Sequence, residues 1–287
     1  MTMNRIPIAN SLLAALPYKD YQHLLPNLEQ VTLTFGDTIY EPGATIRHVY
    51  FPCDSLISLL TLVEGHLALE VGLIGREGML GVSLALGVNI SPVRAIVQGT
   101  GTALRMKSAR FLQEFQRSPA IQREIYLYTH ALMAQVTQTA ACNRFHVVEA
   151  RLARWLLMTR DRVRSNEFRL TQEFLAHMLG VRRVGVTKAA SALQRRKLIS
   201  YSRGDIRILN LKNLEAAACP CYEIVKDMHD NSGLDAVIKN GKKPGTGLPL
   251  PGRVDAPTKV LATQNTSSPP DARKLPGTVG APHYDLP

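Results

Sequence analysis

The sequence has few of the features that mark membrane and secreted proteins. No run approaches the roughly 18 apolar residues that a bilayer-spanning helix needs. Four cysteines in 287 residues do not make a disulfide framework. Asn10 and Ser11 interrupt the apolar core that a signal peptide would require. We therefore expect a cytoplasmic protein with no membrane partner.

Catalytic and metal-binding motifs are also missing. The chain has no GxxxxGK[ST] and no GxSxG, and its eight histidines show no HExxH spacing. Cys219-Pro220-Cys221 could ligate a metal or an iron–sulfur cluster, but such a cluster generally takes four thiolates, and Cys53 and Cys142 lie in different elements. Free thiols are favoured. We expect no catalytic residue, no metal and no cofactor.

Acidic residues are scarce in one region. Residues 151–212 hold 15 Lys and Arg against 4 Asp and Glu, whereas the remaining 19 of each sign cancel, so this region carries the whole net charge of +11. Residues 180–199 contain six basic side chains and no acid. Such a surplus favours a polyanionic partner, with nucleic acid as the first candidate. The alternative is a basic surface that only aids solubility.

The chain then divides by pattern. Leucines at helical spacing, interrupted by Pro17 and Pro26, predict short helices over 11–31. From Val31 to about Lys107, short runs rich in Val, Ile, Leu, Thr and Tyr alternate with Gly, Pro, Asp and Asn, which is typical of an antiparallel roll or barrel. We expect a β-roll domain over residues 11–117.

A long helix is predicted over residues 118–146. Ser118 and Pro119 fit an N-cap followed by proline at the first helical position. One seam of this helix repeats at alternating gaps of four and three: Ile121, Ile125, Tyr128, Leu132, Gln135, Thr139 and Cys142. The helix could pack on its own domain, but the long seam with a polar second half favours a helix that forms a homodimer.

Residues 147–225 predict a winged helix-turn-helix. An amphipathic helix over 147–163 comes first. Thr171 can cap the next helix, and Gly180 allows the tight turn into a second helix over 182–195. Two β-leaning runs around Arg203-Gly204-Asp205 predict a two-stranded wing.

The second helix presents an open cationic face. Such a face suits the major groove, where Arg pairs with guanine and basic residues hold phosphate. On the wing, Arg203 and Arg207 would approach the DNA backbone. The candidate DNA-binding residues are Thr171, Arg182, Arg183, Thr187, Lys188, Ser191 and Arg203.

The remaining residues, 229–287, are rich in Pro, Gly and Ser with hardly an aromatic, which predicts a disordered tail.

Two stretches, ALPYKDYQHLLPNLEQVTLTFGDTIYEPG and LTQEFLAHMLGVRRVGVTKAASALQRRKLI, resemble the Crp–Fnr family of bacterial transcription regulators. The likeness covers residues 11 to about 225, and the second stretch is the more specific. It implies an α+β fold: a cyclic-nucleotide-binding-like jelly roll, a dimerisation helix and a winged helix-turn-helix. It also implies a homodimer that binds a two-fold-related site on double-stranded DNA and contacts RNA polymerase.

The sequence departs from the family pattern at two places. Val184 stands where the family's recognition helix often carries a Glu, so a different DNA site is expected. Glu77 and Arg94 only approximate the residues that meet a cyclic nucleotide, because Arg94 falls about one position late and a shift by one turns a strand side chain to the other face. We therefore expect no cyclic-nucleotide binding, with Glu77 and Arg94 as the candidate effector residues should it occur.

Two functions remain. The first is a sequence-specific transcription regulator under the control of the roll. The second is a sensor subunit that acts through protein contacts, but this second function gives no reason for Arg182, Arg183 and Lys188 to share an open face.

Overall fold

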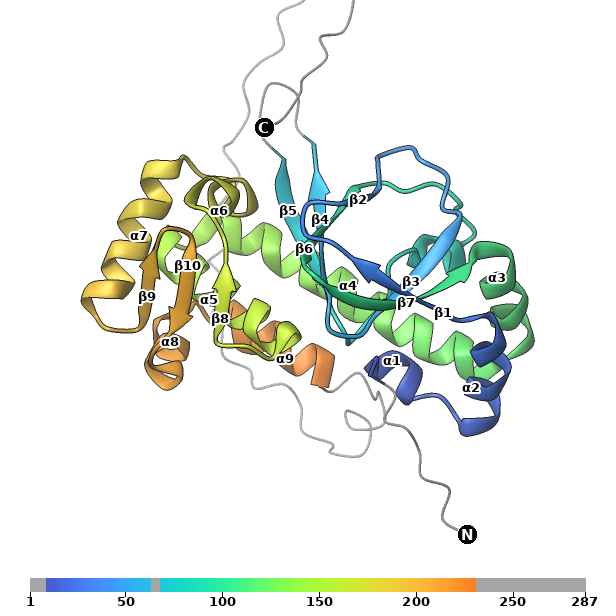
Figure 1. Ribbon diagram of the computed structural model, residues 1–287. Coiled ribbons are helices and arrows are strands. Elements are labelled where there is room, and N and C mark those ends of the chain that lie inside the picture. The colour runs from blue at the N-terminus through green and yellow to red at the C-terminus, as the bar shows by residue number, and fades with distance from the viewer. Residues whose placement is uncertain (1–8, 63–67, 231–287) are drawn as a thin grey trace, which may run out of the picture. The chain divides into compact units, whose positions relative to one another are not determined.

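The computed structural model describes residues 9–62 and 68–230, which belong to one compact unit (Figure 1). The predicted tail lies outside these residues, apart from its first two positions, which end a helix. In the part described, none of the helices is both long and apolar enough to cross a membrane.

Two antiparallel sheets form the β-roll, as the sequence predicts. One has the order β1-β7-β3 and the other β2-β6-β4-β5. Their apolar residues share one core with the first half of the long helix. The strands are β1 Glu29–Leu33, β2 Thr38–Tyr40, β3 His48–Pro52, β4 Leu56–Thr61, β5 Leu69–Ile74, β6 Arg94–Gly99 and β7 Gly101–Lys107.

Short helices precede and follow the strands. Pro17 and Pro26 divide the amino-terminal segment as expected. The elements are α1 Ser11–Ala14, α2 Tyr18–Leu24, η1 Leu25–Asn27, η2 Val82–Leu86 and α3 Ser108–Arg117.

The long helix α4 spans Pro119–Phe145, and Ser118 caps it by accepting a hydrogen bond from the Ile121 N–H at 3.2 Å. The predicted seam, however, is covered by the chain itself. Gln135 bonds both the N–H and the C=O of Leu73, at 3.0 and 3.1 Å, and the Tyr128 hydroxyl donates to the Met79 carbonyl at 2.9 Å. Further along, Thr139 and Cys142 lie against Arg154 and Cys219 rather than the roll. The assignment of this seam to a dimer interface was therefore wrong, because the chain already buries it.

The carboxyl-terminal part is a winged helix-turn-helix with a sheet of three strands, β8-β10-β9, rather than the two expected. The additional strand β8 pairs with β10 through a register that includes Phe168 opposite Ile206. The elements are α5 Val148–Val163, β8 Glu167–Arg169, α6 Gln172–Leu179, α7 Arg183–Arg195, β9 Ile199–Ser202, β10 Asp205–Ile208, α8 Leu211–Ala217 and α9 Cys221–Asp230.

Candidate nucleic-acid interface

The turn between α6 and α7 is built as the sequence predicts. The Thr171 hydroxyl caps α6 by accepting from the Phe174 N–H at 3.1 Å. Gly180 ends α6 in the left-handed region, with φ at 59°, where a residue with a Cβ is strained. Its N–H donates hydrogen bonds to the carbonyls of Ala176 and His177. This turn allows α7 to leave α6 at a steep angle.

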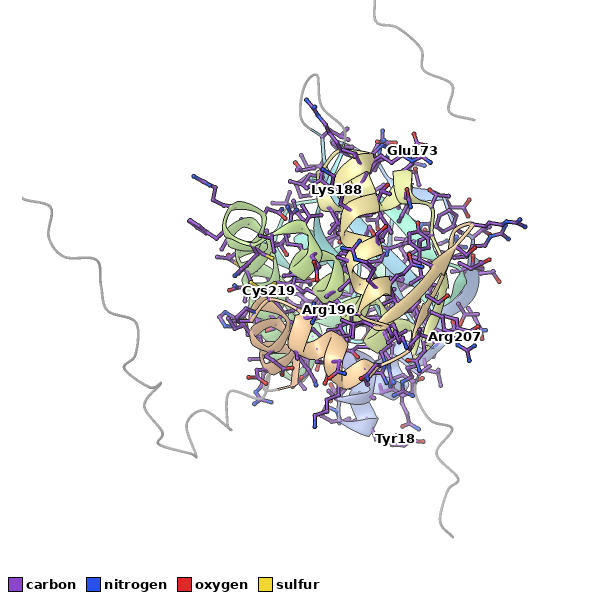
Figure 2. The ribbon with its side chains drawn as sticks, turned by 90° about the vertical axis from the view of Figure 1, so that its left-hand side faces the viewer. Tyr18, Glu173, Lys188, Arg196, Arg207 and Cys219 are labelled. Atoms are coloured by element: carbon purple, nitrogen blue, oxygen red, sulfur yellow. The ribbon has the colours of Figure 1, made fainter. Side chains whose placement is uncertain are left out.

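Helix α7 buries one face and exposes the other. Val186, Ala189, Ala190 and Leu193 are buried against the domain core. The predicted contact residues Arg182, Arg183, Thr187 and Lys188 are exposed, and Ser191 is half-buried. Figure 2 looks onto this side of the molecule, with Lys188 on α7 and Arg207 on the neighbouring wing.

The cations at the start of α7 lack acidic partners. In the described residues, no carboxylate forms an ion pair with Arg182, Arg183 or Lys188, whereas Arg196 at the other end of α7 pairs with Glu149 at 2.8 Å. Unpaired exposed cations at a helix amino terminus can bind phosphate or a base edge without first losing an internal ion pair.

The wing also carries cations, but they are not equivalent. Arg203 and Gly204 form the turn between β9 and β10 with φ of 51° and 92°, as a tight hairpin turn requires. Arg203 is exposed and has no ion pair within the described chain. Arg207 is exposed too, but pairs with Glu167 of β8 at 3.1 Å. Of these two wing arginines, Arg203 is therefore the one whose charge has no partner among the described residues.

Sequence reasoning missed Gln172 as a member of this surface. Its side-chain oxygen accepts a hydrogen bond from the Thr187 hydroxyl at 2.7 Å, which joins the start of α6 to the exposed face of α7. The Thr171 hydroxyl lies one residue before it. The spacing of 15 residues between Gln172 and Thr187 gives no local signal, so only the fold reveals this contact.

Val184 is exposed on the same face, with 59% of its surface accessible. A single exposed apolar side chain is common on a protein surface and does not by itself mark a binding site. A branched apolar side chain in the major groove can contact the methyl group of thymine.

The two candidate effector residues lie apart from each other. Glu77 forms an ion pair with Arg162 of α5, with 2.7 Å between Oε1 and Nε, and also accepts from the Gly75 N–H. Arg94 lies on β6 and pairs with Glu41 at 2.9 Å on the surface. The structure does not bring them into one site, and neither side chain lines the cavity of the roll.

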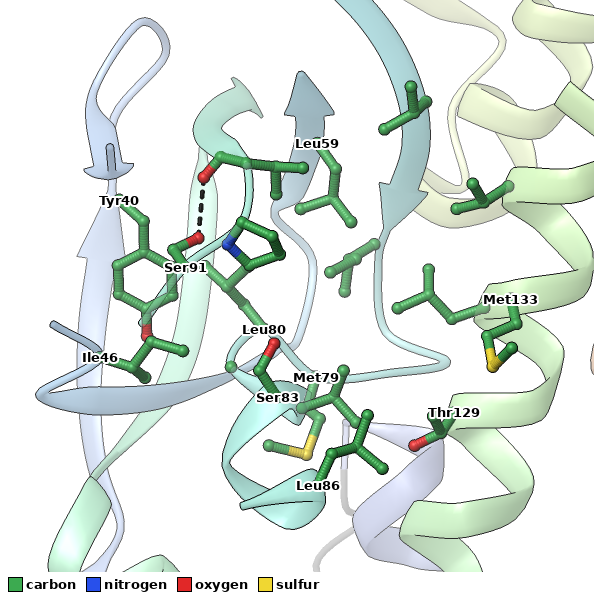
Figure 3. A pocket seen from close by; sticks show the side chains of 18 of the residues that line it. Tyr40, Ile46, Leu59, Met79, Leu80, Ser83, Leu86, Ser91, Thr129 and Met133 are labelled. Atoms are coloured by element: carbon green, nitrogen blue, oxygen red, sulfur yellow. Dashed lines mark hydrogen bonds between the residues drawn. The ribbon is translucent and has the colours of Figure 1, made fainter. Parts of the chain in front are cut away.

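That cavity has a volume of about 370 Å³ and lies between the roll and α4 (Figure 3). The described residues that line it include no charged side chain. Hydroxyls at its wall are already engaged: Ser91 donates to the Val93 carbonyl and Thr129 to that of Ile125, at 2.8 and 2.7 Å. The cavity therefore suits an apolar ligand better than a cyclic phosphate.

The structure brings together cysteines that the sequence places in separate elements. Cys53 lies in the roll, alone and half-buried. Cys142, although in another element, meets the Cys219-Pro220-Cys221 segment, with 3.4 Å between the sulfurs of Cys142 and Cys219. His146 joins the same cluster.

Comparison with known proteins agrees with this architecture. A family model for the Crp-like helix-turn-helix domain matches residues 150–217. No curated protein sequence matches the chain.

Solved structures resemble a larger part of the chain. The c-di-GMP-responsive global regulator CLP of Xanthomonas campestris superposes with a TM-score of 0.56 at 16% identity, over 67% of this chain and 99% of that one. FixK2 of Bradyrhizobium japonicum superposes with a TM-score of 0.58 at 13% identity, over 67% of this chain and 98% of that one. A Crp/Fnr-family transcriptional regulator of Thermus thermophilus superposes with a TM-score of 0.56 at 21% identity, over 66% of this chain and 98% of that one. The chain thus contains a Crp-like helix-turn-helix domain and has the fold of the Crp/Fnr-family transcription regulators.

Proposed function

We propose that the protein is a homodimeric transcription regulator that reads a two-fold-related site on double-stranded DNA with α7. The observation that carries the proposal is the exposed, uncompensated cationic start of α7, in a domain that matches the Crp-like helix-turn-helix. In this proposal Arg182, Arg183 and Val184 meet base edges, Thr187, Lys188 and Ser191 line the groove, and Thr171 and Arg203 hold phosphates.

The proposed dimer uses the face of α4 that the roll leaves open. Tyr126 is 50% and Met133 is 65% accessible, and both lie on this face with His130, Thr137 and Ala140. These positions again follow gaps of four and three, the spacing of a coiled-coil seam. Two copies joined here would place two α7 helices for two half-sites, because protein and operator then share a two-fold axis.

Control by the roll is part of the proposal. A ligand in the cavity would touch Thr129, Leu132 and Met133 of α4, and α4 continues to the DNA-binding domain (Figure 3). We propose an apolar effector for this cavity. A regulator of this kind would act on RNA polymerase at the promoter.

Selection of bound sequences from random double-stranded DNA tests the function. We expect enrichment of an inverted repeat whose half-sites lie one helical turn apart, about 34–36 Å. If no sequence is enriched, the protein holds DNA through phosphate contacts alone and reads no bases. In that case the alternative, a sensor that acts through protein contacts, would replace sequence-specific regulation.

A further inference from the structure

The end of α4 and the segment between α8 and α9 bring four metal-ligating side chains together. Cys142, His146, Cys219 and Cys221 each offer one ligand atom, and these atoms all lie within 4.8 Å of one another. The three cysteines are buried and His146 is half-buried. The Cys142 and Cys219 sulfurs are 3.4 Å apart, and His146 Nδ1 is 3.4 Å from the Cys221 sulfur.

These separations match the edges of a tetrahedral site. A tetrahedral zinc ion binds sulfur at about 2.3 Å and histidine nitrogen at about 2.0–2.1 Å, which places neighbouring ligand atoms about 3.5–3.8 Å apart. A multi-iron cluster fits less well, because its ligands bind different iron atoms and lie further apart. Three thiolates and one imidazole are a donor set that zinc uses in closed structural sites.

The surroundings supply the charge and hydrogen bonds that such a site needs. Three thiolates around Zn²⁺ leave one negative charge. Arg151 and Arg154 are each only 5% exposed, and the Nε of each lacks a hydrogen-bond partner. The Gln138 amide donates to the Cys221 sulfur at 3.0 Å, a bond from outside the ligand set that would orient that ligand.

We propose that Cys142, His146, Cys219 and Cys221 form a structural Zn²⁺ site. His146 is the first residue after α4 and lies in the two-residue connection to α5, while Cys221 begins α9. Both Cys219 and Cys221 lie beyond residues 150–217 of the Crp-like domain. The ion would tie α9, which packs along α4, to the point where α4 leads into the DNA-binding domain (Figure 1).

Metal analysis of the reduced, full-length protein tests the site. We expect one Zn²⁺ per chain. After removal of zinc with a chelator, added Co²⁺ should give the intense visible bands of tetrahedral cobalt with thiolate-to-metal charge transfer. Cys221→Ser and His146→Ala should each lose most of the bound metal, whereas His146→Cys, which keeps four ligands, should retain it.

Cys53→Ser is the matched control, because Cys53 lies in the roll and outside the cluster. It should keep zinc and the cobalt spectrum unchanged. Wild-type protein that carries no zinc and gives no tetrahedral cobalt spectrum after full reduction would overturn the proposal, and a Cys142–Cys219 disulfide in the same protein before reduction would identify a thiol pair instead. Equal metal loss in Cys53→Ser and Cys221→Ser would overturn it as well.

Discussion

Arg183 and Arg203 are both exposed and unpaired within the described chain, but their positions give them different tasks. Arg183 lies in the first turn of α7, where a helix docked in the major groove reaches base edges. Arg203 lies at the tip of the wing, where backbone phosphates are the nearest acceptors. Arg183 should therefore contribute to sequence preference, and Arg203 should contribute only to overall affinity for DNA.

Replacing Arg183 with Ala should cost about 1–3 kcal/mol on the cognate site and relax preference at one base pair. Arg203→Ala should weaken cognate and random DNA about equally and reduce the salt slope by about one. Affinities for single-base site variants at two salt concentrations separate these roles. If Arg183→Ala weakens every sequence alike, α7 is only a phosphate clamp at this position.

Glu70 of β5 is a buried acid between the roll and α5. The Ser58 hydroxyl and the Trp155 indole N–H donate to its carboxylate at 2.8 and 2.9 Å. Desolvation outweighs these bonds and raises its pKa to about 7. A carboxyl whose pKa is raised by folding stabilises the folded protein only while it is protonated.

The contribution of Glu70 to stability should therefore fall as pH rises from the unfolded pKa, 4.5, to about 7, and stay constant above that. Glu70→Gln removes this dependence and should raise the free energy of unfolding at pH 8 by up to about 3 kcal/mol. Denaturant unfolding of the wild type and of Glu70→Gln at pH 5 and pH 8 measures this change in the free energy of unfolding. A variant less stable than wild type at pH 8 would show that the ionised carboxylate contributes net stabilisation.

At the scale of elements, α4 shows what periodicity can and cannot tell. The sequence predicts its start, its cap and its heptad seam, and all three exist. A heptad pattern identifies a face that needs covering, but not which partner covers it. Gln135 belongs to the polar second half of the seam, and it closes hydrogen bonds to Leu73 of its own roll.

Two adjacent residues on α4 test whether its open face forms the dimer interface. Met133→Glu places a charge on the open face and should convert dimers to monomers without unfolding them, as sedimentation would show. Leu132→Glu buries a charge in the chain's own core and should lower the melting temperature strongly. A Met133→Glu protein that remains dimeric would place the interface on another surface.

The wing shows a second limit at this scale. The hairpin of β9 and β10 could be predicted because Arg203-Gly204 is a turn signal between two β-leaning runs. Strand β8 has three residues, Glu-Phe-Arg, with no alternation long enough to recognise. It becomes a strand only because β10 offers a free edge beside it.

In the whole molecule, contacts between distant segments account for most of what the sequence left undetermined. The alternation of strand runs, the long helix and the helix-turn-helix were readable because each is a local pattern. The cysteine cluster was not, because Cys142 and Cys219 are 77 residues apart and meet only when α9 folds along α4. The same holds for the ion pair between Glu77 and Arg162, which joins residues 85 apart in the sequence.

The DNA-binding domain contacts the roll through such pairs. Phe174 of α6 packs on Phe35 with ring centroids 5.4 Å apart, and Trp155 of α5 reaches Glu70. The Glu77–Arg162 ion pair also joins the two parts, with 20% and 7% of the side chains accessible. Desolvation raises the pKa of Glu77, but the charges of Arg162 and His229 and the backbone hydrogen bonds at Glu77 and Gly75 together outweigh it and keep this pKa below its ordinary value.

Breaking this pair should destabilise the protein far more than breaking a surface pair on the same helix. Arg162→Met takes the buried cationic partner away from the half-buried Glu77, which should cost up to about 3–5 kcal/mol of unfolding free energy. Arg160→Met removes an ion pair to Asp161 whose partners are about one third exposed, which should cost about 0–1 kcal/mol. Denaturant unfolding of both variants at pH 7 measures the difference. Equal losses would mean that Glu77 is solvated in the absence of Arg162, and hence that the roll and the DNA-binding domain are not held together at this contact.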